Sequence, residues 1–391
     1  MIDFDFIAPT RVIFGHNAEE RLSELLKEYG VHSVLLVYGG GSIKRSGLYD
    51  RVIAQLNKAD VAYYEIGKIR ANPTKESVFA GIKILREHHC DLILAVGGGS
   101  VIDAAKSMGV GYYYDGDPFD FNLKKAKPTK TIPVGVILTI ASAGSEMSNS
   151  CVISDDATGV KLGFNNDLIR PLFALENPEL TFTVDPHQTA IGFSDIIMHS
   201  LERYFGESDS LQLADEWALD LVKNTMEAGK RALKDPCDYE ARAALMLDSS
   251  LSHNGYTGIG KYCPFTVHPL EHALSGYRPD IPHGAGVALL FPAWANYVLN
   301  KAPAKFAYMA KRLFNLEAKS ELETAIMGVA AMKGFFHSVG MPTSFKEVGI
   351  TENDIPSLVQ LASGNGTRVI GHYPQSLNEQ DIENIYLSLL S

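Results

Sequence analysis

Apolar residues in the first half of the chain form short unbroken runs that end in glycine. Val34–Tyr38 leads directly into Gly39–Ser42, and Leu92–Val96 leads into Gly97–Ser100. Five apolar residues without polar alternation are typical of a parallel strand that is buried on both faces. Helical spacing follows the second run over Val101–Met108. Strand, glycine turn and helix in repetition predict a doubly wound, Rossmann-like α/β domain with a parallel sheet.

Other segments fit the same architecture. A hairpin is expected around the turn DDATG, because residues alternate between apolar and polar on both sides of it. The remaining predictions are helices over 19–29, 49–58 and 74–88, and strands over 62–66 and 131–139.

The pattern changes near Pro186, after which strand-like runs disappear and helical periodicity continues to the end of the chain. Predicted helices cover 211–233, 239–254 and 321–339, a longer helical region covers 287–314, and a C-terminal pair ends at 391. We therefore predict two domains, an α/β domain over 1–184 and an all-helical domain over 185–391.

Composition narrows the class of protein. The 391 residues are 46% apolar and 21% charged, as in globular proteins, and no run approaches the roughly 20 apolar residues of a membrane helix. A formal charge of −11 argues against nucleic acid and anionic membrane as partners. The four scattered cysteines form no CxxC pair, and the N-terminus shows no secretory signal, so a cytoplasmic protein is expected.

The glycine turns are candidates for binding an anion. Gly97, Gly98, Gly99 and Ser100 sit between a strand and a helix, where exposed backbone N–H groups and the helix dipole favour a pyrophosphate. The GxGxxG fingerprint is absent, and tight packing alone also explains such a turn. Thr139 and Ser142 belong to a second polar rim after the 131–139 strand, although turn formers have the same composition.

The first glycine turn bears on the choice of coenzyme. Where many NAD sites place an acidic residue for the ribose, this strand end offers Gly40, Gly41 and Ser42, followed by Lys44. Small residues, a hydroxyl and a cation suit the extra phosphate of NADP. An ordinary solvated loop is the alternative.

Candidate metal ligands lie in the helical half. His268 and His272 are four residues apart, as are Asp195 and His199, so each pair projects from one face of a helix. His283 lies between a proline and a glycine, in a loop or at a helix start. Carboxylate and imidazole groups suit a divalent transition metal, while a local hydrogen bond is the alternative for the Asp–His pair. Spacing alone makes the three histidines equal candidates.

Together these motifs resemble the iron-containing (group III) alcohol dehydrogenases, especially the branch of butanol dehydrogenases and NADPH-dependent aldehyde reductases. The resemblance spans essentially the whole chain and implies the iron-alcohol-dehydrogenase (dehydroquinate-synthase-like) fold. It rests on YGGGSIKRSG, NP at Asn72–Pro73, GGGSVIDAAK, TIASAGSEMS, FSDIIMHSLE, VHPLEHALS and PHGAG, in this order.

The resemblance also implies roles for individual residues. The metal ligands, for Fe²⁺ or Zn²⁺, would be Asp195, His199, His268 and His283, while His272 would lie near nicotinamide and substrate as a catalytic residue. The residues expected at NADP(H), with NAD(H) as the alternative, are Gly40, Gly41, Ser42, Asn72, Gly97, Gly98, Gly99, Ser100, Asp103, Thr139, Ser142 and Lys161.

The expected reaction is hydride transfer between the nicotinamide and a small aldehyde or primary alcohol such as butanol. The resemblance also suggests a homodimer. Rival readings on the same fold are a glycerol-dehydrogenase-like or dehydroquinate-synthase-like enzyme, and a non-enzymatic sensor of nucleotide and metal. The dehydroquinate-synthase-like reading would require several basic residues beside the ligands, where we find only Arg203, Lys261 and Arg278.

Overall fold

The structure is a computed structural model that describes residues 2–208 and 212–390. It divides into two compact units. The α/β unit comprises Ile7–Val184 and Asp235–Asn254. The helical unit comprises Asp185–Lys234 and Gly255–Ser391, together with the N-terminal residues up to Phe6.

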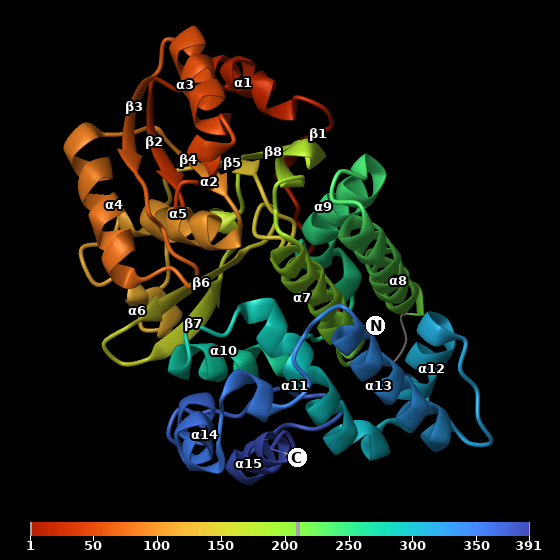
Figure 1. The fold of residues 1–391 in the computed structure, drawn as a ribbon. Coiled ribbons are helices and arrows are strands. Elements are labelled where there is room, and N and C mark those ends of the chain that lie inside the picture. The colour runs from red at the N-terminus through yellow and green to blue at the C-terminus, as the bar shows by residue number, and fades with distance from the viewer. Residues whose placement is uncertain (1, 209–211, 391) are drawn as a thin grey trace. The chain divides into compact units, whose positions relative to one another are not determined.

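A six-stranded parallel sheet forms the centre of the α/β unit (Figure 1), with the strand order β1-β8-β5-β4-β2-β3. A separate antiparallel hairpin pairs β6 with β7 around the predicted DDATG turn. The strands are β1 (Arg11–Phe14), β2 (Ser33–Tyr38), β3 (Ala62–Ile66), β4 (Leu92–Gly97), β5 (Val134–Leu138), β6 (Ser150–Asp155), β7 (Val160–Asn165) and β8 (Phe173–Glu176).

The unbroken apolar runs are explained by burial on both faces of this sheet. In β2, Val34 and Leu36 belong to one apolar core while Leu35 and Val37 belong to the other. Because successive side chains of a strand point to opposite faces, every position of such a strand must be apolar. The doubly wound prediction is confirmed.

Helices cover both faces of the sheet (Figure 1). Residues of α1 and α3 contribute to one core, and residues of α4 and α5 contribute to the other. The helices of this unit are α1 (Leu22–Glu28), α2 (Ser42–Arg45), α3 (Leu48–Ala59), α4 (Lys75–His88), α5 (Gly99–Gly111), α6 (Phe119–Asn122) and α9 (Tyr239–His253), with short 3₁₀ turns η1 (Ala18–Arg21), η2 (Asp167–Ile169) and η3 (Pro178–Thr181).

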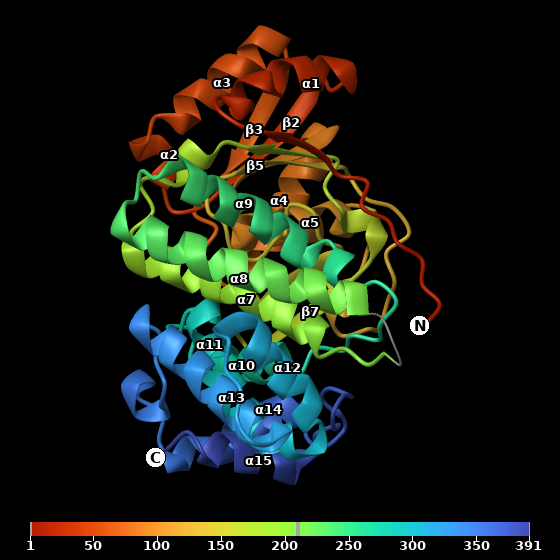
Figure 2. The same ribbon diagram turned by 90° about the vertical axis from the view of Figure 1, so that its right-hand side faces the viewer.

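The helical unit is built on two long antiparallel neighbours, α7 and α8, which run side by side (Figure 2). Helices α10 and α11 pack on each other, and α11 also packs on α7 and α13. The helices are α7 (Pro186–Tyr204), α8 (Gln212–Lys234), α10 (Val267–Tyr277), α11 (His283–Val298), α12 (Pro303–Phe314), α13 (Glu321–Ser338), α14 (Ile355–Ser363) and α15 (Glu379–Leu387), with 3₁₀ turns η4 (Tyr256–Gly258), η5 (Leu299–Lys301), η6 (Phe345–Val348) and η7 (Glu352–Asp354).

The two units differ from the domains expected from the sequence in two segments. The boundary after residue 184 is shared, but α9 packs with the α/β unit although it follows α8 in the chain. The N-terminal residues up to Phe6 group with the helical unit. Helical periodicity shows that a segment is a helix, and it carries no information about which core the helix joins.

Some element boundaries also differ from the predictions. The helical region 287–314 is interrupted at Leu299–Lys301, before Pro303 begins α12. The four-residue strands β1 and β8 were not predicted. The helix expected from 211 is described from Gln212, since Leu211 lies outside the described residues.

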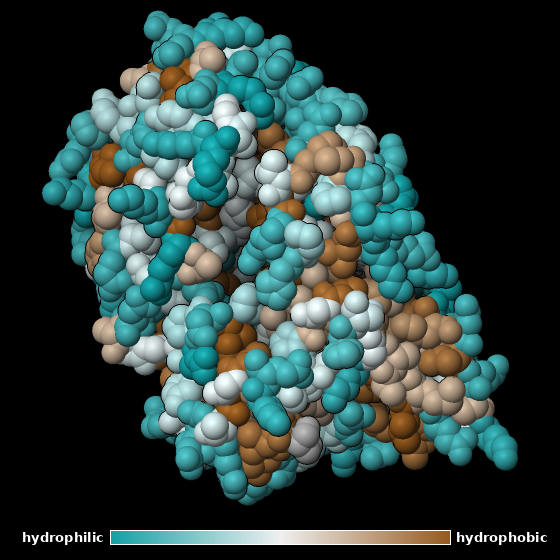
Figure 3. Space-filling view, viewed as in Figure 1, coloured by the Kyte–Doolittle hydropathy of each residue, from teal (hydrophilic) through white to brown (hydrophobic). Residues whose placement is uncertain are grey.

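Large apolar side chains are exposed on one face of α13, where brown atoms gather in Figure 3. Leu322, Ile326 and Met327 are each at least 40% exposed. Among the described residues, no helix combines the length and hydropathy that crossing a membrane would need.

Candidate active site

Helix α7 carries two of the predicted ligands into the interior of the helical unit. Its first turn is fixed by Pro186 and by Asp185, whose carboxylate accepts a hydrogen bond of 2.9 Å from the backbone N–H of Gln188. Asp195 and His199 follow one face of this helix and are 1% and 4% exposed. The predicted shared face is confirmed.

Helix α10 carries His268, and its start is held by a residue of α7. The carboxylate of Glu202 accepts hydrogen bonds from the backbone N–H groups of Thr266, Val267 (2.7 Å) and His268 (3.1 Å). No side chain of α10 itself caps this end. Glu202 therefore satisfies N–H groups that every helix start leaves without partners inside the helix.

His283 is the first residue of α11, and the glycines after it allow the close packing that places it. A Cβ on Gly284 would lie 2.1 Å from the carbonyl oxygen of Ile191 in α7. A Cβ on Gly286 would lie 2.7 Å from Cγ of Glu271 in α10. The motif PHGAG thus lets α11 approach both helices that carry the other candidate ligands.

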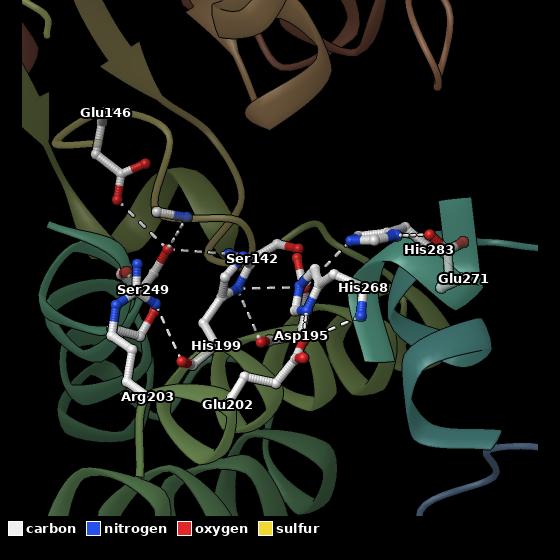
Figure 4. Close-up of polar contacts among 12 residues, drawn as sticks. Ser142, Glu146, Asp195, His199, Glu202, Arg203, Ser249, His268, Glu271 and His283 are labelled. Carbon is white, nitrogen blue, oxygen red and sulfur yellow. Dashed lines mark hydrogen bonds and ion pairs between the residues drawn. The ribbon is translucent and has the colours of Figure 1, made fainter. Parts of the chain in front are cut away.

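The four predicted metal ligands lie together around one carboxylate oxygen (Figure 4). Oδ1 of Asp195 is 3.6 Å from Nε2 of His268, 3.6 Å from Nε2 of His283 and 3.3 Å from Nδ1 of His199. Asp195, His199 and His268 are buried, while the side chain of His283 is 25% exposed. Residues separated by 88 positions in the chain are thus brought to one point.

Each imidazole of this cluster has a partner at Nδ1. His199 donates from Nδ1 to the carbonyl oxygen of Asp195 at 3.0 Å, since a carbonyl can only accept. Nδ1 of His268 bonds to Glu202, and Nδ1 of His283 bonds to Glu271. These contacts direct Nε2 of His268 and of His283 toward Asp195.

The electrostatics of the cluster favour an ionised carboxylate. Burial alone would raise the pKa of Asp195, but the charges of His199, His283 and His268 hold it well below its usual range. Burial, aided by the charges of His268 and Arg203, keeps the pKa of His199 well below the ordinary value, despite Asp195. Burial also acts to lower the pKa of His268, but the charges of Glu202 and Asp195 raise it to about 9.

These residues fit a divalent metal ion. Within the described residues, Nε2 of His268 is a buried atom with no hydrogen-bond partner. Ligands bound tetrahedrally at 2.0–2.2 Å lie about 3.4 Å from each other, close to the 3.6 Å between Oδ1 of Asp195 and Nε2 of His268 and of His283. A buried carboxylate facing three imidazole rings is a donor set suited to Fe²⁺ or Zn²⁺.

His272 lies beside this cluster and forms a second group with potential ligand atoms close together, shared with Glu271 and His283. The ring centroids of His272 and His283 are 5.5 Å apart, and those of His272 and His268 are 6.4 Å apart. His272 is more exposed than His268. Asp195, His199 and His268 form the other such group, and His283 joins the two because its Nε2 also lies 3.6 Å from Oδ1 of Asp195.

In the α/β unit, the two predicted glycine turns and Thr139 follow the carboxyl ends of neighbouring strands of the sheet. Strands β2, β4 and β5 are neighbours, and Tyr38 pairs with Val96 while Gly97 pairs with Leu138. The turns that follow these strands therefore leave the same edge. β2 lies between β3 and β4, so the chain reverses direction across the sheet there, which is where open α/β sheets bind ligands.

The glycines of the second turn have a packing reason of their own. A Cβ on Gly97 would lie 2.6 Å from Val101, on Gly98 2.2 Å from Ile140, and on Gly99 2.9 Å from Ala143. Ser100 follows them in the first turn of α5. Close packing explains these glycines whether or not an anion binds.

Asp103 is engaged inside the protein. Its carboxylate accepts from the hydroxyl of Ser145 at 2.6 Å and from the backbone N–H of Val152 at 2.9 Å. Lys106, completely buried, donates to the same Ser145 hydroxyl at 2.9 Å, and burial lowers its pKa to about 8. Lys161, on β7, adds positive charge that acts on Asp103.

The other predicted cofactor residues lie on loops. The backbone N–H of Thr139 bonds to the carbonyl of Gly97, and the backbone N–H of Ser142 bonds to Ser249 of α9, which also donates to Glu146 (Figure 4). Asn72 has a left-handed backbone with φ of 54° and precedes Pro73.

The first glycine turn is open. Nothing lies within 4 Å of a Cβ built on Gly40, and Gly41 has a left-handed φ of 106° before Ser42 begins α2. Nζ of Lys44 lies over the rings of Tyr38 and Tyr49, at 5.0 and 4.5 Å from their centroids. A cation is thus held next to the turn.

Two residues of the metal cluster were missed by the sequence analysis, namely Glu202 and Glu271. Glu202 follows His199 by three positions in an apolar helix, and Glu271 lies between His268 and His272. An acidic residue in an otherwise apolar helical face was the available signal, because a buried carboxylate needs a partner.

A parallel α/β unit with glycine turns and a helical unit with a buried Asp–His cluster together define the iron-alcohol-dehydrogenase class of fold. Residues 9–178 match the family described as iron-containing alcohol dehydrogenase, and residues 189–390 match the C-terminal domain of the Fe-containing alcohol dehydrogenase family. The chain belongs to the iron-containing alcohol dehydrogenase family.

Individual relatives agree with this assignment over nearly full length. NADH-dependent butanol dehydrogenase A of Clostridium acetobutylicum is 40% identical over 99% of both chains. The NADPH-dependent aldehyde reductase YqhD of Escherichia coli is 33% identical over 95% of both. The crystal structure of an NADH-dependent butanol dehydrogenase A from Thermotoga maritima superposes with a TM-score of 0.96 at 34% identity, covering 100% of this chain and 99% of the other.

Proposed function

We propose that the protein is a metal-containing, NAD(P)-dependent alcohol dehydrogenase and aldehyde reductase. It transfers hydride between the nicotinamide and short- to medium-chain aldehydes or primary alcohols such as butanol. The observation that carries this proposal is the buried Asp195 cluster, in which His268 and His283 both direct Nε2 toward one carboxylate oxygen. Relatives named as butanol dehydrogenases and as an aldehyde reductase support the substrate class.

The metal would be held by Asp195, His199, His268 and His283. When bound, a divalent ion supplies Lewis-acid polarisation of the substrate oxygen. The donor set suits Fe²⁺ and Zn²⁺, and the family description supports iron.

In reduction, the aldehyde carbon receives a hydride and its oxygen receives a proton, while the nicotinamide is oxidised. We propose that His272 relays this proton from solvent, since it lies beside His283 and is partly accessible to solvent. The metal-binding imidazoles bond to other groups through Nδ1 and are poor candidates for the same task.

We propose a preference for NADP(H) over NAD(H). Its support is the open turn at Gly40–Ser42 and the cation of Lys44 beside it, which suit a 2′-phosphate. The relatives are divided, because the two butanol dehydrogenases are named for NADH and YqhD for NADPH. The proposed preference for NADP(H) therefore rests on the turn Gly40–Ser42 and on Lys44.

The matched test compares Lys44→Ala with the wild type on both coenzymes. Loss of the cation should lower kcat/KM for NADPH about tenfold and leave kcat/KM for NADH within twofold, since only the 2′-phosphate carries the extra charge. Equal effects on both coenzymes, or a wild type that uses NADH better, would contradict the preference.

The dehydroquinate-synthase-like alternative is disfavoured by where the nearby cations are engaged. Arg203 donates to the carbonyl of His199 and stacks on Phe265, and Lys261 is paired with Asp215. Arg278 pairs with Asp280 at 2.7 Å. The phosphate-bearing substrate of a dehydroquinate-synthase-like enzyme would need free cations beside the ligands, whereas these three are already bonded to groups of the protein.

The decisive experiment pairs metal analysis with a coenzyme assay. Butyraldehyde should cause steady oxidation of NADPH or NADH by the purified protein, and a chelator should stop it until Fe²⁺ or Zn²⁺ is restored. Absence of turnover with every aldehyde and ketone of a panel, in metal-loaded protein, would contradict an oxidoreductase and favour a sensor.

A homodimer is the proposed assembly, supported by the exposed apolar residues Leu322, Ile326 and Met327 on α13. A molar mass near 85 kDa in solution, about twice the 42.7 kDa of the chain, would agree with it. The cytoplasmic location expected from the sequence stays a prediction.

A further inference from the structure

Two buried glutamates contact the candidate metal ligands without facing the proposed metal position. Glu202 is 6% exposed and Glu271 is 0% exposed. Each bonds through one carboxylate oxygen to Nδ1 of a histidine, Glu202 to His268 and Glu271 to His283. A carboxylate buried in this way is costly unless it has such a partner.

The contacts determine the state of each ring. A carboxylate accepts a hydrogen bond, so Nδ1 of His268 and of His283 carries a proton and Nε2 is the nitrogen left to bind a metal. Both Nε2 atoms lie 3.6 Å from Oδ1 of Asp195. Without these glutamates, either ring would be able to rotate or to change tautomer.

We propose that Glu202 and Glu271 are positioning residues that set the affinity for the metal by holding His268 and His283 in the ligating tautomer and orientation. A carboxylate behind a metal-bound imidazole also makes the ring a stronger donor. The inference rests on the metal site of the proposed function.

The two glutamates differ in what else they hold. Oε1 of Glu202 accepts from the N–H groups of Thr266 and Val267, and Oε2 accepts from the N–H of His268 as well as from its ring. This one carboxylate thus ties α10 to α7, which carries Asp195 and His199. Glu271 lies on α10 and reaches the first residue of α11.

The difference predicts two distinct outcomes for glutamine variants. In Glu271→Gln the amide oxygen is still able to accept from Nδ1 of His283, so the ring stays oriented and only the charge is lost. In Glu202→Gln one end of the side chain becomes an NH₂ group facing N–H donors, so the start of α10 is disturbed too. Glu202→Gln should therefore lower both metal affinity and Tm, and Glu271→Gln should lower metal affinity alone.

The test measures the affinity of purified full-length protein for Zn²⁺ and Co²⁺ by competition with a chelator, and records the visible spectrum of the Co²⁺ form. Each glutamine variant should bind about 10–100-fold more weakly than the wild type. Glu271→Ala should weaken binding further than Glu271→Gln and alter the Co²⁺ spectrum. Glu317→Gln, at an exposed surface glutamate paired with Lys311, is the control and should bind like the wild type.

A double-mutant comparison makes the inference specific. In a His283→Ala background, Glu271→Gln should cause less than a twofold further change, because its partner ring is gone. Wild-type affinity in folded Glu271→Gln and Glu271→Ala variants would overturn the proposal. A wild type that binds neither ion would instead overturn the metal site itself.

Discussion

The glycine edge of the α/β unit, which is the turn Gly97–Ser100 with Asp103, differs from the Asp195 cluster of the helical unit. The two regions differ in whether contacts within the protein are enough to explain their residues. At the glycine edge, Gly97, Gly98 and Gly99 are explained by close contacts within the protein, and Asp103 already has two hydrogen-bond donors. In the cluster, Asp195, His199 and His268 are buried polar groups placed together at a cost in free energy. Packing accounts for the first region, while a bound metal is our proposed explanation for the second.

The largest effect that this comparison predicts is that of His268→Ala. Removing one of the imidazoles should abolish bound metal, and activity should fall by about 10³-fold or more since the Lewis acid is lost. Metal content by mass spectrometry and turnover of butyraldehyde measure the two effects on the same sample. Full activity in a metal-free variant would contradict the proposal that the Asp195 cluster holds a metal needed for the reaction.

At the glycine edge, Gly98→Ala should destabilise the fold itself. The added Cβ would meet Cγ2 of Ile140 at 2.2 Å, and overpacking of this kind costs about 1–3 kcal/mol. Denaturant unfolding measures this loss, and metal content should stay at the wild-type level. An unchanged free energy of unfolding would contradict the packing account of this turn.

The matched variant Gly40→Ala separates ligand effects from packing effects. Nothing lies within 4 Å of its added Cβ, so the free energy of unfolding should change by less than about 0.5 kcal/mol. A several-fold rise in the KM for coenzyme with unchanged stability would then report contact with the dinucleotide. A wild-type KM would remove this turn from the binding site.

His272→Ala tests the border of the metal cluster. The variant should retain its metal, because the four proposed ligands Asp195, His199, His268 and His283 remain, while kcat falls about 10–100-fold or its dependence on pH changes. Loss of metal to the extent seen in His268→Ala would show that His272 is a ligand.

The smallest effect concerns a buried carboxyl pair in the α/β unit. The hydroxyl of Ser250 contacts Glu146 at 2.7 Å and Glu176 at 3.0 Å, and it can donate to only one of them. Burial raises the pKa of Glu146, and burial together with the charge of Glu146 raises the pKa of Glu176 well above its ordinary value. The two carboxyl groups share one hydroxyl donor, and burial disfavours the charged form of each.

The raised pKa values have a defined consequence for stability. Above about pH 4.5 the folded state binds more protons than the unfolded chain, so this contribution is complete below that pH and is lost as pH rises. The slope is at most about 1.4 kcal/mol per pH unit for one proton. Between pH 5 and 8 the Tm of the wild type should fall more than that of Glu176→Gln; parallel curves would contradict the assignment.

The same contrast explains what was predictable from the sequence. Strands β2, β3 and β4 were recognised because burial on both faces leaves an unbroken apolar run. β1 and β8 were not predicted because each strand has only four residues, and the residues of β1 are partly or fully exposed. The local pattern of apolar residues was sufficient to predict a strand when burial on both faces made every position of that strand apolar.

The sequence predicted which residues form the site, but it did not predict the hydrogen bonds that join them across separate helices. The spacing of Asp195 and His199 identified a shared helix face, but the contacts of Glu202 and Glu271 join separate helices. Similarly, α9 reads as an ordinary helix of the second half, and only tertiary packing assigns it to the α/β unit. Partners that lie far apart in the chain leave no periodic pattern.

The most direct test of the metal site is a crystal structure of the Zn²⁺-loaded protein, with the ion located by anomalous scattering. The account predicts one ion about 2.0–2.2 Å from Asp195, His199, His268 and His283, with Nδ1 of His268 and of His283 still bonded to Glu202 and Glu271. An ion bound instead by Glu271, His272 and His283, with the Asp195 group left outside its coordination, would contradict it.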